Sequence, residues 1–160
     1  MQILVVSDSH EEVDILRALL DEYAAMVQLV IHLGDHDRDL LRLAPITALP
    51  LLTISGNTDD LLRSPRERVC SFKSKKFLLT HGHIYNINAG IDLLVHKALE
   101  VEAKICLYGH THIATTFTKH GIFFMNPGSI TEPRDDNPPS YGLLKIDEAT
   151  GEISGDILYI

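Results

Sequence analysis

Residues 3–10 read ILVVSDSH, a short apolar run that passes directly into polar side chains. The apolar part predicts a buried β-strand, and the residues after it show helical spacing of apolar side chains. The same alternation of strand and helix continues over the first third of the chain. The expected elements are strands at 3–6, 29–33 and 51–54 and helices at 11–23 and 37–43. Since parallel strands need crossover connections of this kind, the order predicts a parallel sheet with right-handed crossovers.

The remainder of the chain has a different pattern, dominated by short strands. We expect a hairpin around 73–75, one further helix, and a Pro- and Asp-rich loop at 132–140. The expected strands are 69–72, 76–80, 105–108, 113–119, 122–126, 141–147 and 152–159, and the helix is 90–102. Such elements bury their apolar faces by packing in layers. The sequence therefore predicts an α/β protein of one domain, in which two sheets pack together with helices outside.

The chain is acidic, with 14 Lys and Arg against 22 Asp and Glu and a formal net charge of -8. Binding of nucleic acid through an extended face needs clustered basic residues, so we expect no nucleic-acid-binding face. Arg63, Arg66 and Arg68 are interpreted as a solvated face instead.

The first residues predict a strand and not a targeting segment, because the apolar run is short and acidic residues follow it closely. No window reaches the roughly 18 apolar residues that a membrane span needs, so no membrane partner is expected. The two cysteines, Cys70 and Cys106, form no disulfide framework and no metal-type spacing, which favours a reducing compartment. We therefore expect the protein to be cytoplasmic.

Side chains that can bind metals follow five of the predicted strands, each after a small residue. They are Asp8 and His10, Asp35, Asn57, His81, and His110 and His112. In open α/β sheets, ligands bind outside the carboxyl ends of the strands, where these side chains would meet. Residues two apart in extended backbone project to the same side, so each Asp-x-His or His-x-His pair can face one ion. The ordered set predicts a metal site.

The number of candidate ligands indicates two ions. Seven ligands exceed the four to six that one ion of this kind usually takes. Two ions with about four ligands each need one bridging residue, and only a carboxylate bridges well, which leaves Asp8 or Asp35. Two ions roughly 3.5–4 Å apart can clamp the attacking and leaving oxygens of a phosphoryl group.

Together these segments resemble the calcineurin-like metallophosphoesterases, and most of all their small bacterial and archaeal phosphodiesterase branch. The family pattern is Asp-x-His, Gly-Asp, Gly-Asn, His-Gly and Gly-His-x-His. Here it stands as Asp8-Ser9-His10, Gly34-Asp35, Gly56-Asn57, His81-Gly82 and Gly109-His110-Thr111-His112, with Asn126-Pro127-Gly128-Ser129 and Pro133-Arg134 following. The resemblance implies one calcineurin-like phosphoesterase domain over residues 1–160. Its fold would be a four-layer α/β/β/α sandwich of two packed mixed sheets flanked by helices.

The resemblance also implies a dinuclear metal-dependent phosphoesterase, in the first place a phosphodiesterase. A metal-bridging hydroxide would attack a small phosphate-ester substrate. The implied ligands are Asp8, His10 and His112 for one ion and Asn57, His81 and His110 for the other. Asp35 would bridge the ions, and Asp35, Asn57 and His81 are the expected catalytic residues. Mn is the first expectation for both divalent ions, with Ni, Fe, Zn or Co as alternatives.

Thr58 departs from the family pattern, because many relatives carry a histidine there that helps the leaving group. A threonine cannot act as a general acid near neutral pH, which weakens any prediction of attack on esters with poor leaving groups. A small residue at this place fits the phosphodiesterase branch. The neighbouring Asp59 is interpreted either as a hydrogen-bond partner of a metal ligand or as a turn residue.

Four residues are candidates for contact with substrate. They are Asn57, Thr58, His83 and Arg134. Arg134 has a forked guanidinium that suits two phosphate oxygens, and His83 lies two residues beyond His81. The alternative for both is a solvated loop position. His32, inside a predicted strand, is expected to be a hydrogen-bonded core histidine, and His36 is expected to be exposed.

Two other functions stay open at this point. One is a catalytically weak protein-binding scaffold on the same fold, as in the retromer subunit that resembles this family. The intact set of ligands favours the enzyme over the scaffold. The other keeps the enzyme but makes it a nucleotide pyrophosphatase or phosphomonoesterase. Assembly into a homo-oligomer is likewise left open.

Overall fold

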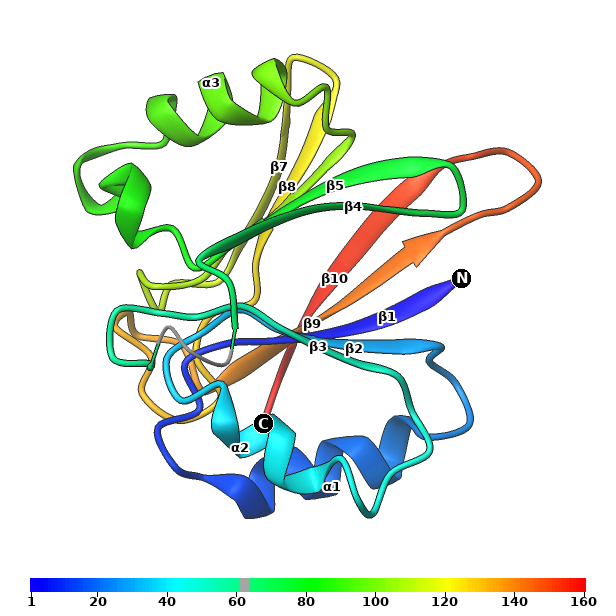
Figure 1. Cartoon of the computed structure of the whole chain (residues 1–160), viewed down its shortest axis with the longest axis vertical. Coiled ribbons are helices and arrows are strands. Elements are labelled where there is room, and N and C mark those ends of the chain that lie inside the picture. Colours follow the sequence, from blue (N-terminus) through cyan, green and yellow to red (C-terminus); the bar gives the residue numbers. More distant parts are fainter. Residues whose placement is uncertain (61–63) are drawn as a thin grey trace.

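The computed structural model describes residues 1–60 and 64–160, so Arg63 lies outside the described residues. Two five-stranded sheets lie face to face, with α1 and α2 outside one sheet and α3 outside the other (Figure 1). This is the four-layer α/β/β/α sandwich expected from the sequence. Arg66 and Arg68 are exposed, as a solvated face requires.

Sheet A has the strand order β10-β9-β1-β2-β3. Its strands are β1 (Gln2–Val6), β2 (Leu29–His32), β3 (Leu51–Thr53), β9 (Ser140–Ile146) and β10 (Ile153–Tyr159). The first three strands are parallel, as predicted, and are joined by α1 (Val13–Tyr23) and α2 (Arg38–Leu43). β9 pairs antiparallel with β1, which makes the sheet mixed.

Sheet B has the order β4-β5-β6-β8-β7. Its strands are β4 (Glu67–Phe72), β5 (Lys75–Thr80), β6 (Ile105–Leu107), β7 (Thr115–Lys119) and β8 (Ile122–Asn126). β4 and β5 form the predicted hairpin, with Lys73 and Ser74 in its turn at positive φ. Two 3-10 turns, η1 (His83–Tyr85) and η2 (Ile87–Ala89), lead into α3 (Asp92–Glu100).

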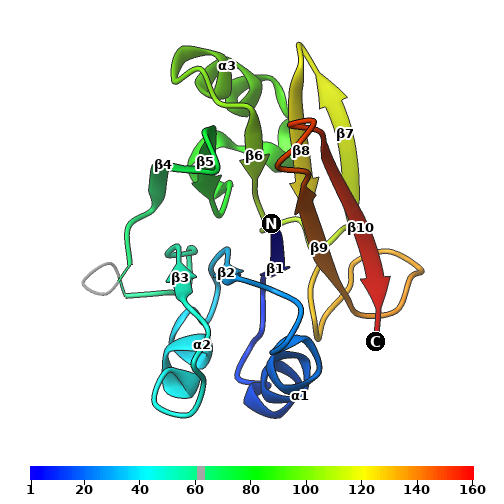
Figure 2. The ribbon, with the colours of Figure 1, turned by 90° about the vertical axis from the view of Figure 1, so that its right-hand side faces the viewer.

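The core lies in three layers, and β1 shows how the sequence builds it. Ile3 and Val5 face sheet B, whereas Leu4 and Val6 pack against the helices on the other side. A strand covered on both faces reads as a continuous apolar run, which is why the segment contains no alternation. At one edge of the sandwich, β10 and β7 contact each other and join the two sheets (Figure 2).

The structure corrects the boundaries of four predicted elements by two residues, and one of these is the strand predicted from 69, which begins at Glu67. The first helix begins at Val13 instead of residue 11, and the strand predicted from 113 begins at Thr115, because both preceding segments form loops with residues at positive φ. The helix predicted over 90–102 covers only Asp92–Glu100, and the two 3-10 turns before it were not predicted. They are too short to show periodicity in the sequence.

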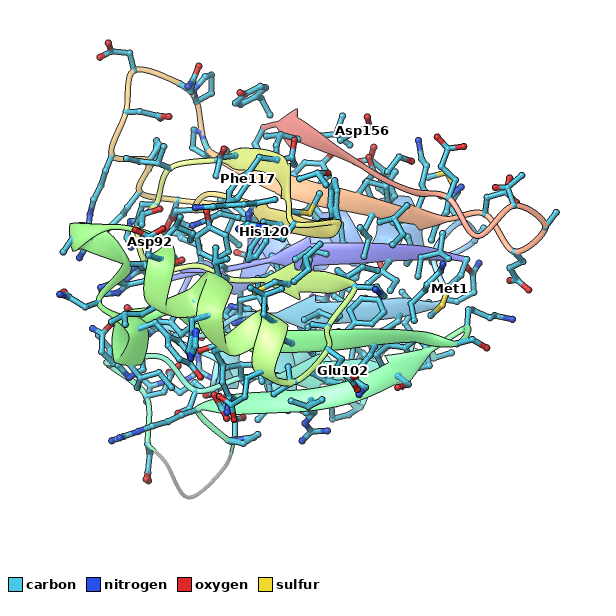
Figure 3. All side chains as sticks on the ribbon, turned by 90° about the horizontal axis from the view of Figure 1, so that it is seen from above. Met1, Asp92, Glu102, Phe117, His120 and Asp156 are labelled. Carbon is cyan, nitrogen blue, oxygen red and sulfur yellow. The ribbon has the colours of Figure 1, made fainter. Side chains whose placement is uncertain are left out.

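β1 starts beside Met1, and its carboxyl end points to the opposite end of the molecule, where Asp92 begins α3 (Figure 3). The loops that carry the candidate ligands follow the carboxyl ends of strands in both sheets. Within residues 1–60 and 64–160, no helix is long and apolar enough to cross a membrane.

Candidate metal centre

The loops after the parallel strands bring carboxylates and imidazoles of both sheets together. Asp8 Oδ1 lies 3.1 Å from His112 Nε2 and 3.8 Å from His81 Nε2. Asp35 Oδ2 lies 3.5 Å from His81 Nε2. Two groups have their ligand atoms within 4.8 Å of one another. They are Asp8 with His10 and His112, and Asp8 with Asp35 and His81.

The remaining two predicted ligands adjoin these groups. His110 Nδ1 lies 3.2 Å from His81 Nε2, so both nitrogens face the same point. Asn57 is exposed in the loop after β3. Its neighbour Thr58 donates a backbone N–H to Asp35 Oδ1 at 3.0 Å, which holds that loop against the carboxylate. The structure thus brings six of the seven predicted ligands together, whereas Asn57 is placed only by the contact of its neighbour with Asp35.

The two ligand loops of sheet A touch through glycines. A Cβ on Gly34, whose φ is 101°, would lie 2.6 Å from the backbone nitrogen of Gly56. A Cβ on Gly56 would lie 2.1 Å from Asp35 Oδ1. Only glycine leaves room for this approach, so the Gly-Asp and Gly-Asn motifs have a steric cause.

The backbone of the centre is strained. Five of the predicted ligands have left-handed backbone angles, with φ of 54° at Asp8, 44° at His10, 53° at Asp35, 70° at His110 and 59° at His112. Each such residue costs on the order of 1–3 kcal/mol and persists only where its surroundings hold it. Strain concentrated on these residues indicates a functional site.

Hydrogen bonds to the backbone fix two of the histidines. His81 Nδ1 bonds to the carbonyl oxygen of Leu33 at 2.8 Å, and His112 Nδ1 to that of Glu132 at 2.6 Å. A carbonyl oxygen only accepts, so each Nδ1 carries a proton and each Nε2 is left to face the cluster. Such partners set the tautomer of metal-binding histidines in proteins.

The carboxylates are held in a similar way. Asp8 Oδ2 accepts hydrogen bonds from Ser7 Oγ at 2.6 Å and from the backbone N–H of His110 at 3.2 Å. Among the described residues, the buried atoms Asp8 Oδ1 and His10 Nε2 have no hydrogen-bond partner. An unsatisfied buried oxygen and nitrogen facing one point fit a cation that binds N and O ligands.

The carboxylates and histidines of the cluster shift one another's pKa. Burial alone would raise the pKa of Asp8 and Asp35, but the neighbouring imidazoles of His112 and His81 hold both below their usual value. Burial alone would lower the pKa of His81 and His112, but the two carboxylates raise it. Two carboxylates buried at one point need positive charge beside them, from protons on histidine or from metal ions.

Asp59 links the loops after β2 and β3 through hydrogen bonds to their backbone N–H groups. Its Oδ1 accepts the backbone N–H groups of His36 at 2.7 Å and Asp37 at 3.1 Å, and its Oδ2 that of Gly56 at 2.8 Å. The partners are thus backbone groups that flank Asp35 and Asn57. Asp59 and Thr58 also line a cavity of about 200 Å³.

Two candidates for substrate contact, His83 and Arg134, adjoin residues of the cluster. The His83 ring lies 5.5 Å from that of His81, and its buried Nδ1 has no hydrogen-bond partner in the described residues. Arg134 is exposed and donates its backbone N–H to the carbonyl of His112 at 3.3 Å. Burial and His81 lower the pKa of His110, and the charge of Arg134 adds to this effect.

The predicted burial is confirmed for His32, but the predicted exposure of His36 is not. His32 is fully buried and hydrogen-bonded, as predicted, with Nε2 at 3.0 Å from Ser9 Oγ and Nδ1 accepting the N–H of Gly34 at 3.1 Å. The prediction that His36 is exposed was wrong. Its ring is partly buried because it lies against that of His10, with a centroid distance of 5.0 Å.

Sequence reasoning missed several residues that hold the ligand loops. Asp39 Oδ2 accepts Ser9 Oγ–H at 2.7 Å and the N–H of Glu11 at 2.8 Å, on both sides of His10. Ser129 Oγ–H donates to the carbonyl of Asp8 at 2.8 Å. Asn126 Nδ2 donates to the carbonyl of Gly109 at 2.9 Å. The Asn-Pro-Gly-Ser motif was a signal for the last two, whereas Asp39 is part of an ordinary helical pattern.

Comparison with known proteins shows the family of the chain. The family model for the calcineurin-like phosphoesterase superfamily domain matches residues 1–149. The chain is 29% identical over 175 residues to the phosphodiesterase YfcE of Escherichia coli (strain K12), covering 92% of this chain and 89% of that protein.

Two solved structures share the fold over nearly the whole chain. A predicted phosphoesterase from Streptococcus pneumoniae TIGR4 has a TM-score of 0.84 at 35% identity, covering 99% of this chain and 88% of that one. Vps29 from Entamoeba histolytica, in complex with zinc, has a TM-score of 0.76 at 25% identity, covering 99% and 98%.

Proposed function

Because the chain belongs to the calcineurin-like phosphoesterase superfamily, we propose that it is a dinuclear metal-dependent phosphodiesterase. One observation carries the proposal. Carboxylates and histidines from the ends of strands in both sheets have their ligand atoms gathered in two overlapping groups. Two adjacent ions are the arrangement that stabilises both attacking and leaving oxygens of a phosphoryl group.

Each ion has its own proposed ligands. One set is Asp8, His10 and His112, and the other is Asn57, His81 and His110. The first set coincides with one of the two groups of ligand atoms. The second is supported by the facing nitrogens of His81 and His110. When bound, divalent ions activate water for in-line attack and polarise the phosphoryl oxygen. Mn is our first choice among Mn, Ni, Fe, Zn and Co.

Asp35 is proposed as the bridge between the ions. Its Oδ1 is held by the N–H of Thr58, while Oδ2 faces His81. Asp8 is the rival, because its Oδ1 faces both His112 and His81. Loss of a bridge weakens both ions, whereas loss of an ordinary ligand weakens one. Mn²⁺ titrations of Asp35→Asn and Asp8→Asn therefore separate the two assignments.

The chain's own side chains would hold the substrate. Arg134 and His83 are proposed to donate hydrogen bonds to phosphate oxygens. Asn57 and Thr58, which are neighbours in the loop after β3, would orient the ester. Since Thr58 supplies no proton near neutral pH, esters with good leaving groups are expected to react fastest. A small phosphate ester is the expected substrate.

The test is a panel of substrates with Mn²⁺, Ni²⁺ or Zn²⁺. We expect bis(4-nitrophenyl) phosphate to be hydrolysed faster than 4-nitrophenyl phosphate or a nucleoside pyrophosphate. Asp35→Asn and His81→Ala should each lower the rate more than about a hundredfold. His96→Ala, an exposed position on α3, is the matched control and should leave the rate unchanged. Circular dichroism shows whether each variant is folded.

Two results would replace the proposal. Faster hydrolysis of the monoester or pyrophosphate would make the protein a phosphomonoesterase or nucleotide pyrophosphatase. Absence of all hydrolysis would favour a scaffold, which the likeness to Vps29 keeps as the second candidate. Metal binding alone does not separate enzyme from scaffold, since that Vps29 structure contains zinc.

A cytoplasmic location is part of the proposal. Cys70 and Cys106 are both free thiols, and Cys106 is fully buried beside α3. Free cysteines suit a reducing compartment.

A further inference from the structure

His110 is held differently from the other histidines of the centre. His81 and His112 are fixed by backbone carbonyls, whereas His110 Nε2 lies 3.1 Å from the side-chain amide of Asn88. Asn88 is exposed in η2, four residues before Asp92, which Figure 3 shows at the end of the molecule opposite Met1. A carbonyl only accepts a hydrogen bond, but an amide group can donate or accept.

Without an ion, hydrogen bonds link Asn88, His110, His81 and Leu33 in a row, and each group donates to the next. In the neutral form of His81, Nδ1–H donates to Leu33 and Nε2 is an acceptor. His110 Nδ1, 3.2 Å away, must then carry the proton and donate it. His110 Nε2 is left as an acceptor for the amide N–H of Asn88. This order of donors satisfies every nitrogen of the chain.

An ion shared by His81 and His110 reverses part of this order. Both facing nitrogens must offer lone pairs to the ion, so the proton of His110 has to reside on Nε2. Nε2–H then needs an acceptor, and the N–H of Asn88 would clash with it. Rotation of the Asn88 amide by half a turn presents its oxygen instead.

We propose that Asn88 is a positioning residue for His110, whose amide turns over when the second ion binds and thereby sets the affinity of that ion. The inference rests on the proposed dinuclear centre. It predicts an asymmetry between the ions, because among the described residues no side-chain amide bonds to His10 or His112 of the first set. Hydrogen-bond partners of metal-binding histidines typically change metal affinity by about 10- to 100-fold.

The test compares two substitutions at the same exposed position. Asn88→Leu keeps the size but removes both donor and acceptor, and Asn88→Asp keeps only the acceptor. In calorimetric titrations with Mn²⁺, the wild type should bind two ions. Asn88→Leu should weaken one of them by about 10- to 100-fold and leave the other within about threefold. Asn88→Asp should bind both at least as tightly as the wild type.

The tautomer of His110 gives a readout independent of activity. Long-range ¹H–¹⁵N spectra should show the proton on Nδ1 in the metal-free wild type and on Nε2 with a diamagnetic ion such as Zn²⁺. In Asn88→Asp it should be on Nε2 already without metal. Asn137→Leu, which alters an exposed asparagine in another loop, is the matched control and should behave as the wild type.

The titrations distinguish an error in the dinuclear centre from an error in the role of Asn88. A wild type that binds no divalent ion overturns the dinuclear centre and this inference together. A wild type that binds two ions with an Asn88→Leu variant of equal affinity overturns only the role of Asn88. Weakening by Asn88→Asp as strong as that by Asn88→Leu does the same, because the acceptor would then be irrelevant.

Discussion

Burial in the core keeps the imidazole of His32 uncharged, so the free energy of unfolding should depend on pH. Burial lowers the pKa of His32 to about 4 from an ordinary value of 6.5. Between these values the unfolded chain takes up a proton that the folded chain does not, so stability falls as the pH drops below 6.5. The expected slope from this residue is about 1.4 kcal/mol per pH unit.

Urea unfolding of the chelated protein at pH 7.5, 6 and 5 measures the slope. His32→Gln should be less stable than the wild type at pH 7.5, because it loses the hydrogen bonds to Ser9 and Gly34, but should lose less stability on acidification. His96→Gln, exposed on α3, should keep the wild-type slope. Equal slopes in all three proteins would contradict the assignment.

At the scale of elements, Asp59 joins the loops that follow β2 and β3. It accepts three backbone N–H groups, two beside Asp35 and one beside Asn57. Asp59→Ala leaves these donors without that acceptor, so we expect a loss of about 2–3 kcal/mol of stability and weaker Mn²⁺ binding. Asp136→Ala, an exposed carboxylate in the 132–140 loop, is the control for loss of charge alone. Unchanged Mn²⁺ affinity in Asp59→Ala would show that the loops hold their positions without the clamp.

The elements also show what the sequence can predict. Apolar runs and helical spacing predict β1 to β3 and α1, because these elements take their stability from burial. The seven candidate ligands could be selected because each follows a predicted strand, and the structure gathers ligand atoms of five of them. Asp59, Asp39 and Asn88 could not, since their partners come from other loops and no local pattern marks them. Ser129 bonds to the carbonyl of Asp8, 121 positions away in the sequence.

In the whole molecule, the candidate centre lies where the two sheets meet. Asp8 and Asp35 follow strands of sheet A, whereas His81 and His110 follow strands of sheet B. The net charge of -8 therefore says little about the site, where two divalent ions would reverse the local sign. Ions bound at this point would tie one sheet to the other.

Removal of metal should accordingly destabilise the whole fold and not only the loops. An ion at a free concentration of about 100 times its dissociation constant stabilises the folded state by about 2.7 kcal/mol, which corresponds to at least about 5 °C in melting temperature for a chain of this length. Calorimetry should show this loss after dialysis against EDTA and its recovery with Mn²⁺. Asp35→Asn should show a smaller difference between the two conditions, because bound ions would no longer be shared by both sheets through that carboxylate. If the wild type melts at the same temperature with EDTA and with Mn²⁺, the ions do not bind at the seam between the sheets.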